Sequence, residues 1–260
     1  MTRVLAVTNQ KGGVGKTTTS VNLAAGLATS GMRVLLVDLD PQGNATMGSG
    51  VDKRALKTSV YHVLLGLATA DAARLKSEAG GYDLIPANRD LAGAEVELVD
   101  LEHRESRLKE ALKSIVDQYR FVLLDCPPAL NMLTVNALVA AHAVMIPMQC
   151  EYYALEGLSD LVTTIKKVRQ NLNPKLEIEG LLRTMYDPRN TLAQQVSTQL
   201  LEHFGDKVYA TVIPRNVRLA EAPSYGAPAV KLDRECKGSQ AYIELVGEIL
   251  SRNGLAATVS

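Results

Sequence analysis

The sequence predicts a doubly wound α/β fold, in which helices cover both faces of a mostly parallel β-sheet. Strand-like and helix-like segments alternate through the 260 residues, which is the pattern of consecutive βαβ units. The strand-like segments are continuous apolar runs, as expected for parallel strands that are buried on both faces. No linker-like segment divides the chain, so we expect one domain over residues 1–260.

The elements follow in order from this pattern. The first strand, residues 4–8, leads through a glycine-rich loop into a helix over residues 17–30, which Gly31 ends. Further apolar runs predict strands at residues 34–38, 121–125, 143–147, 178–185 and 208–214, with a shorter candidate at 82–85. Helical periodicity predicts helices at residues 104–118, 133–141, 156–172, 192–204 and 239–252. Residues 43–81 are the least regular stretch, and we expect an insertion near the functional site there.

Composition limits the class of protein. Lys plus Arg equals Asp plus Glu, at 28 each, so a constitutively basic nucleic-acid binder is disfavoured and any such surface must be a local patch. The three scattered cysteines, Cys126, Cys150 and Cys236, indicate free thiols in a reducing compartment. Neither a signal peptide nor an apolar run of about 20 residues is present, so we expect a cytoplasmic protein.

The strongest functional signal is the loop after the first strand. A buried strand enters it and a helix leaves it, which is the context that a phosphate-binding loop requires. Backbone N–H groups of Gly12, Gly13, Val14 and Gly15 would face phosphate oxygens, and the helix start adds its dipole. Lys16 would neutralise β and γ oxygens, the Thr17 hydroxyl would hold Mg²⁺, and Thr18 completes the segment. The sequence therefore predicts a site for ATP and Mg²⁺.

This loop departs from the usual phosphate-loop pattern in one respect. The first Gly of Gly-x-x-x-x-Gly-Lys-[Ser/Thr] falls on Gln10, and an additional lysine, Lys11, opens the loop. A dinucleotide-binding Gly-x-Gly-x-x-Gly is disfavoured, because Thr18 stands where its third Gly should be. Farther along, Asp125 ends an apolar strand beside the predicted loop, where its carboxylate could hold Mg²⁺ through water or cap a helix.

At Lys11 the chain resembles the ParA/MinD family of deviant Walker ATPases. Other blocks are similar to switch I of that family at residues 36–46 and to its Walker B and switch II segment at residues 122–128. Residues 146–157 and 212–224 resemble blocks of chromosomal ParA proteins, also called Soj. The resemblance covers residues 3–252, and we expect the chain to lack the N-terminal DNA-binding region of larger plasmid ParA proteins.

The resemblance implies roles for particular residues. Lys11 would reach across a dimer interface to the ATP of the partner, with Gly12 allowing the two loops to approach closely. Asp40 would position or deprotonate the attacking water and lie near the metal. Asp38 would support it, and the sequence alone cannot separate these two roles. Pro214 and Asn216 would lie against the adenine.

The resemblance also implies a slow ATPase that acts in DNA partition. ATP would drive a sandwich homodimer that binds DNA non-specifically, and a ParB-type partner would stimulate hydrolysis and release it. Arg189 and Arg218 match DNA-binding positions of the family, whereas Arg183, Arg215, Lys231, Arg234 and Lys237 are weaker candidates. The protein would then associate with the nucleoid when ATP is bound. The sequence does not say whether the replicon is a chromosome or a plasmid.

Two other functions within the same ATPase class stay open. A MinD-like membrane-associated regulator needs a basic amphipathic C-terminal helix, and residues 251–260 have one basic residue and no wide apolar face, so stable membrane association is not expected. An iron–sulfur carrier needs clustered cysteines, and the three cysteines here are far apart in the sequence.

Overall fold

The computed structural model describes residues 1–256 and contains one eight-stranded sheet, with strand order β3-β4-β2-β5-β1-β6-β7-β8. The strands are β1 Arg3–Val7, β2 Val34–Asp38, β3 Leu75–Ser77, β4 Tyr82–Ile85, β5 Phe121–Asp125, β6 Ala143–Met148, β7 Glu177–Tyr186 and β8 Val208–Pro214. Every neighbouring pair is parallel except β3 and β4, which pair antiparallel. The predicted fold class is therefore confirmed.

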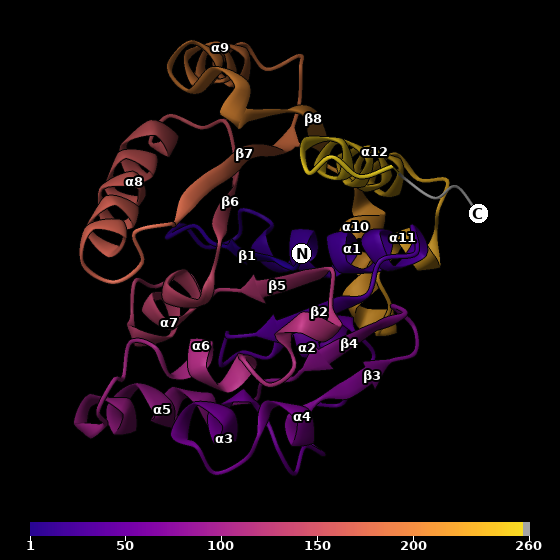
Figure 1. Cartoon of the computed structure of the whole chain (residues 1–260). Helices are drawn as coiled ribbons and strands as arrows, with labels where there is room; N and C mark the ends of the chain where they lie inside the picture. Colours follow the sequence, from indigo (N-terminus) through magenta and orange to yellow (C-terminus); the bar gives the residue numbers. More distant parts are fainter. Residues whose placement is uncertain (257–260) are drawn as a thin grey trace.

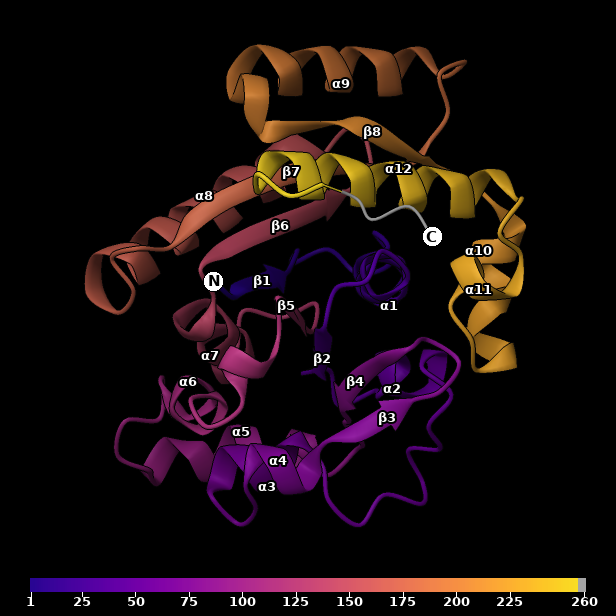
Figure 2. The same cartoon turned by 45° about the vertical axis from the view of Figure 1, so that its right-hand side comes forward.

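Helices cover the sheet on both faces (Figures 1 and 2). They are α1 Lys16–Thr29, α2 Asn44–Gly48, α3 Val60–Leu65, α4 Ala70–Ala73, α5 Leu91–Glu97, α6 Arg107–Leu112, α7 Met132–Ala140, α8 Ala154–Asn171, α9 Thr191–Phe204, α10 Val217–Glu221, α11 Ala229–Leu232 and α12 Lys237–Arg252. Buried residues of α3 to α9 pack on one face, and those of α1, α2, α11 and α12 pack on the other. Alternate residues of each central strand enter the two cores, as with Val4 and Leu5 of β1, which explains the continuous apolar runs.

Some predicted elements differ from the structure. The helix predicted at residues 104–118 is wrong, because α6 ends at Leu112 and a separate 3₁₀ turn spans Val116–Gln118. The Thr2 hydroxyl donates to the carbonyls of Val116 (3.2 Å) and Tyr119 (2.9 Å), and this tertiary contact draws the chain away from a continuous helix. The irregular stretch at residues 43–81 contains α2, α3, α4 and β3, all too short for sequence periodicity to detect.

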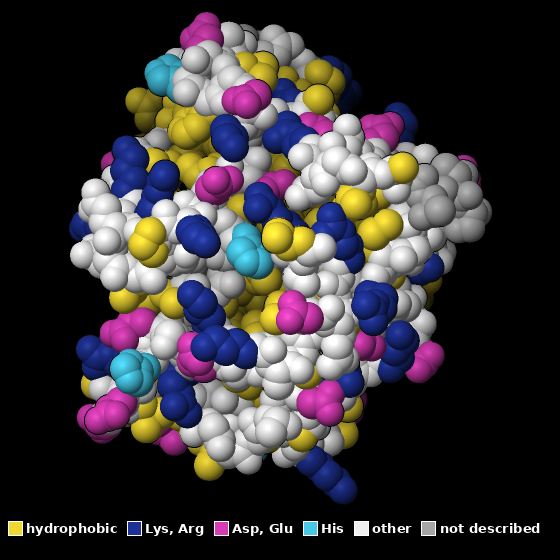
Figure 3. Space-filling model, in the orientation of Figure 1, with side chains coloured by type: hydrophobic (Ala, Val, Ile, Leu, Met, Phe, Trp, Pro, Cys, Tyr) yellow, Lys and Arg dark blue, Asp and Glu magenta, His cyan; other side chains and the backbone are white. Residues whose placement is uncertain are grey.

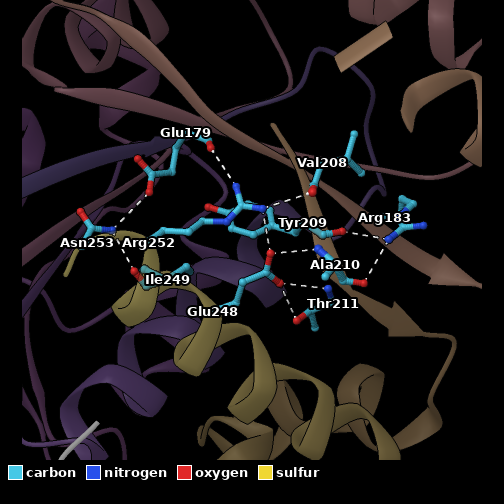
Figure 4. Close-up of polar contacts among 10 residues, drawn as sticks. All are labelled: Glu179, Arg183, Val208, Tyr209, Ala210, Thr211, Glu248, Ile249, Arg252 and Asn253. Carbon is cyan, nitrogen blue, oxygen red and sulfur yellow. Dashed lines mark hydrogen bonds and ion pairs between the residues drawn. The ribbon is translucent and has the colours of Figure 1, made fainter. Parts of the chain in front are cut away.

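Helix α12 is fastened to strand β8 by a polar network (Figure 4). The Arg252 guanidinium lies over the Tyr209 ring, 4.3 Å from its centroid, and donates to Glu248 at 2.8 Å. The Glu248 carboxylate accepts the backbone N–H groups of Ala210 and Thr211, each at 2.9 Å. This network satisfies backbone donors of an edge strand and holds α12 against it.

Candidate nucleotide-binding site

The phosphate loop connects β1 to α1 at the carboxyl edge of the sheet. Gly13 and Gly15 have φ of 75° and 85°, in the left-handed region that only glycine enters without strain. A Cβ built on Gly12 or Gly13 would meet no other atom within 4 Å, so both glycines border open space. The N–H groups at the start of α1 face this opening, because Gly15 is its N-cap.

Lys16 lies inside the loop. Its side chain is buried, and its ammonium donates to the Lys11 carbonyl at 3.0 Å. The other two N–H bonds of this ammonium have no acceptor among the described residues. Burial lowers the pKa of Lys16, and the neighbouring Asp125 partly offsets this effect. A buried cation with free donors beside an open glycine loop is suited to receive phosphate oxygens.

The carboxylate of Asp125 forms the metal side of the site. It is fully buried and accepts hydrogen bonds from the hydroxyls of Thr17 and Ser20, both at 2.8 Å. Burial, and then the nearby Asp38, raise the pKa of Asp125 to about 7. These hard oxygen donors fit Mg²⁺. The described residues contain no cluster of three or more His, Cys, Asp or Glu that could hold a metal ion.

The structure gives Asp38 and Asp40 different surroundings. Asp38 is fully buried, and its oxygens accept the Thr46 N–H (2.8 Å), the Thr46 hydroxyl (2.7 Å) and the Asp40 N–H (3.1 Å). Asp40 is half-buried, and one of its oxygens accepts the Gln42 N–H at 2.9 Å. Asp38 therefore holds the loop after β2 in place, while a second oxygen of Asp40 has no partner among residues 1–256.

Lys11 lies at the surface at the start of the phosphate loop. Its ammonium forms an ion pair with Glu151, and the side chain is 46% exposed. The Lys11 N–H donates to the Asn9 side chain at 3.0 Å, and Asn9 in turn donates to the Pro147 carbonyl at 2.8 Å. The two lysines of the loop are thus separated, one buried in the site and one at the surface.

A cavity of about 150 Å³ adjoins the loop and contains two of the residues predicted to contact adenine. Pro214 and Asn216 line it together with Gly15, Thr18 and Met185. The Asn216 side chain also caps α10 by accepting the Leu219 N–H at 3.4 Å. A largely apolar cavity beside the phosphate loop is suited to a purine base.

The predicted DNA-contacting arginines are paired with carboxylates of their own chain. Arg189 is 88% exposed and lies 2.9 Å from Asp187, while Arg218 lies 3.1 Å from Glu221 and 3.4 Å from Asp233.

Arg183, a weaker candidate from the sequence, is buried in the structure. It donates to the Ser197 hydroxyl at 2.9 Å. It also donates to the Tyr209 carbonyl at 2.8 Å (Figure 4). The prediction that Arg183 is a surface cation is therefore wrong. Its hydrogen bonds hold β7 against α9 and β8.

Sequence reasoning missed several side chains that shape the site. Ser20 contacts Asp125, and its position one turn after Lys16 on the same helix could have indicated this. Thr184 donates to the Val14 carbonyl at 2.8 Å and ties β7 to the loop. Asn9 accepts the N–H of Lys11 two residues later in the same loop, whereas Glu151, which pairs with the Lys11 ammonium, comes from a distant segment that no local pattern links to it.

The buried carboxylate of Asp125 should make the nucleotide-free protein less stable as the pH rises. Its folded pKa lies above the unfolded value, so the folded state binds more protons, and the free energy of unfolding falls between about pH 4 and pH 7. Asp125→Asn should flatten this dependence and raise stability at pH 8 by about 1 kcal/mol or more. Urea denaturation at pH 5 and pH 8 tests this, with the exposed Asp52→Asn as control. A variant with the wild-type pH dependence would contradict it.

Together, the doubly wound sheet and the glycine loop holding Lys16, Thr17 and Asp125 define a P-loop ATPase. Comparison with known proteins agrees. The family described as "AAA domain" matches residues 2–178. The chain is 54% identical over 252 residues to the chromosome partitioning protein ParA of Caulobacter vibrioides, covering 96% of this chain and 94% of that protein. It is 52% identical over 249 residues to the sporulation initiation inhibitor protein Soj of Bacillus subtilis, and the match covers 96% of this chain and 98% of that protein.

A solved structure is similar over the same length. The crystal structure titled cobyrinic acid a,c-diamide synthase from Mycobacterium smegmatis, with bound ADP and magnesium, has a TM-score of 0.87 and 42% identity, covering 98% of this chain and 96% of that one. The chain belongs to the AAA-domain family of P-loop ATPases and, within it, to the ParA/Soj group of deviant Walker partition ATPases.

The two alternative functions would depend on the C-terminal segment and on the cysteines. Within residues 1–256, no helix is long and apolar enough to cross a membrane. Helix α12 ends at Arg252, and residues 257–260 of the C-terminal tail lie outside the described residues. Cys126, Cys150 and Cys236 are free cysteines, and the first two are buried.

Proposed function

We propose that residues 1–260 act as one DNA-partition ATPase domain, whose nucleotide site is completed by a second copy of the chain. The observation that supports this most directly is the placement of the two loop lysines. Lys16 is buried in the site of its own chain, whereas Lys11 projects from the surface toward Glu151. A surface lysine next to an open phosphate loop is available to the ATP of a partner. ATP binding would then favour a sandwich homodimer.

The residues of the site have separate roles in ATP hydrolysis. Bound Mg-ATP supplies the phosphate bond to be broken and the metal charge. The loop N–H groups and Lys16 orient the phosphates, Thr17 and Asp125 hold the metal side, and Pro214 and Asn216 hold the base. Asp40 orients or deprotonates water. Without Lys11 of the partner the site lacks one cation, and such a missing donor reduces the rate by about 10³-fold or more.

The proposed cycle couples this slow hydrolysis to DNA. The ATP dimer would bind duplex DNA without sequence preference through Arg189 and Arg218 of both chains. It would then associate with the nucleoid in the cytoplasm, and a ParB-type partner would stimulate hydrolysis and release it. Symmetric doubling of a small patch suits a chain of zero net charge, because affinity depends steeply on the number of phosphates neutralised.

The experiment is a salt titration of duplex DNA binding in an ATP-locked Asp40→Ala background. Arg189→Ala or Arg218→Ala removes two phosphate contacts from a dimer, so the slope of log affinity against log salt should flatten by roughly two. Arg218→Glu should weaken binding further. Arg54→Ala, at another exposed arginine, should change nothing. Sedimentation should show the same ATP-dependent dimer for all of these variants. An unchanged slope in both alanine variants would place the DNA surface elsewhere.

A further inference from the structure

The carboxylate of Asp125 has two hydrogen-bond donors, and one of them lies outside the phosphate loop. The Thr17 hydroxyl donates to Oδ2 at 2.8 Å, and the Ser20 hydroxyl donates to Oδ1, also at 2.8 Å. No other hydrogen-bond donor reaches this carboxylate within residues 1–256. Each oxygen of Asp125 therefore has one donor, and together the two hydroxyls define the plane of the carboxylate.

The geometry of α1 explains why these two hydroxyls meet one carboxylate. Thr17 and Ser20 are three residues apart, so they lie on the same side of the helix. Helix α1 packs beside β5, the strand that Asp125 ends (Figure 2). Thr19 lies on another side of the helix, where its hydroxyl is 3.0 Å from that of Tyr242 in α12. The turn of the helix therefore directs Ser20, but not its neighbour, to Asp125.

The hydrogen bond from Ser20 is directed mainly to Asp125. The hydroxyl has one hydrogen to donate, and its two possible acceptors are Asp125 at 2.8 Å and the Lys16 carbonyl at 3.1 Å. The carboxylate is the closer acceptor and, when ionised, the stronger one. Ser20 and Asp125 are both fully buried, so water does not compete for this bond.

Ser20 does not border the open space around the phosphate loop. Two cavities adjoin the start of α1, one of about 150 Å³ lined by Gly15 and Thr18, and one of about 250 Å³ lined by Thr17 and Thr18. Ser20 lines neither of these cavities. Any effect of its hydroxyl on a bound ligand must therefore pass through Asp125.

We propose that Ser20 is a positioning residue for Mg²⁺, which fixes the orientation of Asp125 and touches neither the metal nor the nucleotide. The inference rests on the proposed role of Asp125 on the metal side of the site. Thr17 would serve both the metal and Asp125 when Mg²⁺ is bound, whereas Ser20 serves the carboxylate alone. Groups that orient a metal-binding side chain in this way typically contribute about 10- to 100-fold to metal affinity.

The test measures how the binding of ADP depends on the concentration of free Mg²⁺. Ser20→Ala removes the donor without changing any charge, and alanine is favoured in the interior of a helix. We expect the Mg²⁺ concentration for half of the maximal effect to rise about tenfold, the lower end of the range because Thr17 still donates. The affinity for ADP in EDTA should stay close to that of the wild type, since the loop and Lys16 are unchanged.

Another buried serine provides the matched control. Ser49, at the end of α2, donates to the Ala45 carbonyl at 2.7 Å and lies 2.6 Å from the Tyr82 hydroxyl, so it makes one backbone and one side-chain contact, as Ser20 does. Ser49→Ala should leave the Mg²⁺ dependence unchanged. Ser20→Cys retains a weak donor and should give an intermediate shift. Thermal unfolding without nucleotide checks that the variants fold.

Ionic strength is held constant in these titrations. Lys and Arg side chains are mixed with Asp and Glu side chains over the face seen in Figure 3, and added salt screens such exposed charges. At constant ionic strength, a shift between wild type and Ser20→Ala reports the local change at Asp125, because the substitution leaves every charge in place.

A double-mutant cycle tests whether Ser20 acts through Asp125. Asp125→Asn should itself raise the Mg²⁺ requirement, and Ser20→Ala should add nothing in that background. The inference would be overturned by an unchanged Mg²⁺ dependence of Ser20→Ala, by an equal loss of ADP affinity with and without Mg²⁺, or by effects that multiply in the double variant. An unchanged Mg²⁺ dependence of Asp125→Asn would refute the metal role of Asp125 and this inference with it. Because ADP is used, no outcome bears on the ATP-driven dimer.

Discussion

Replacement of Lys16 by Ala is expected to weaken ATP binding by about 10²- to 10³-fold. The Lys16 ammonium has two N–H bonds available for phosphate oxygens, and each charge-assisted hydrogen bond contributes about 1.5–3 kcal/mol. Removing the cation also leaves the buried Asp125 without a neighbouring positive charge. Isothermal titration calorimetry with a non-hydrolysable ATP analogue and Mg²⁺ measures the effect.

The other loop lysine provides the comparison for this prediction. Lys11→Ala removes an exposed ammonium that contacts Glu151, so the monomer should bind nucleotide within a few-fold of wild type. The same variant should fail to dimerise with the analogue, as measured by sedimentation. Thermal unfolding without nucleotide checks that both variants fold. Near-normal affinity of Lys16→Ala, or normal dimerisation of Lys11→Ala, would refute the division of roles between the two lysines.

The sequence was sufficient to predict the strands that are buried on both faces of the sheet. Strands such as β5 enter two cores at once, so their apolar runs are continuous and unambiguous. Strand β3 has three residues, and its Leu75 and Lys76 are exposed, so no apolar signal could identify it. The chain after α6 forms a 3₁₀ turn at Val116–Gln118, and the Thr2 hydroxyl that contacts this turn comes from more than a hundred residues away in the chain.

The same distinction between local and long-range information applies to the functional site. The loop residues are contiguous, so their spacing alone predicts their chemistry. The partners that position them come from distant strands: Thr184 of β7 contacts Val14, and Glu151 after β6 contacts Lys11. Hydrogen bonding also distinguishes two aspartates whose roles the sequence alone could not separate. Asp38 uses both oxygens to bind the backbone and hydroxyl of its own loop, and Asp40 keeps one free.

That difference leads to the prediction for Asp40. Asp40→Ala should leave ATP and Mg²⁺ binding within a few-fold of wild type, because Lys16, Thr17 and Asp125 are unchanged. Hydrolysis should fall by about 10²- to 10⁴-fold, the usual contribution of a positioned general base. With binding intact and turnover lost, ATP should hold the chain as a dimer. Single-turnover release of phosphate measures the chemical step, and sedimentation with ATP follows the dimer.

A second aspartate in the same kind of turn makes a close control. Asp52 accepts the N–H of Arg54 at 3.0 Å, just as Asp40 accepts that of Gln42 at 2.9 Å, but it lies in the loop before α3. Asp52→Ala removes an equivalent turn contact and should hydrolyse ATP at the wild-type rate. Asp40→Asn keeps an oxygen for the Gln42 N–H and removes the basic group, so it should be as slow as Asp40→Ala. If Asp40→Asn instead retained wild-type turnover, the carboxylate would be dispensable, and the residue would act only through the shape of its loop.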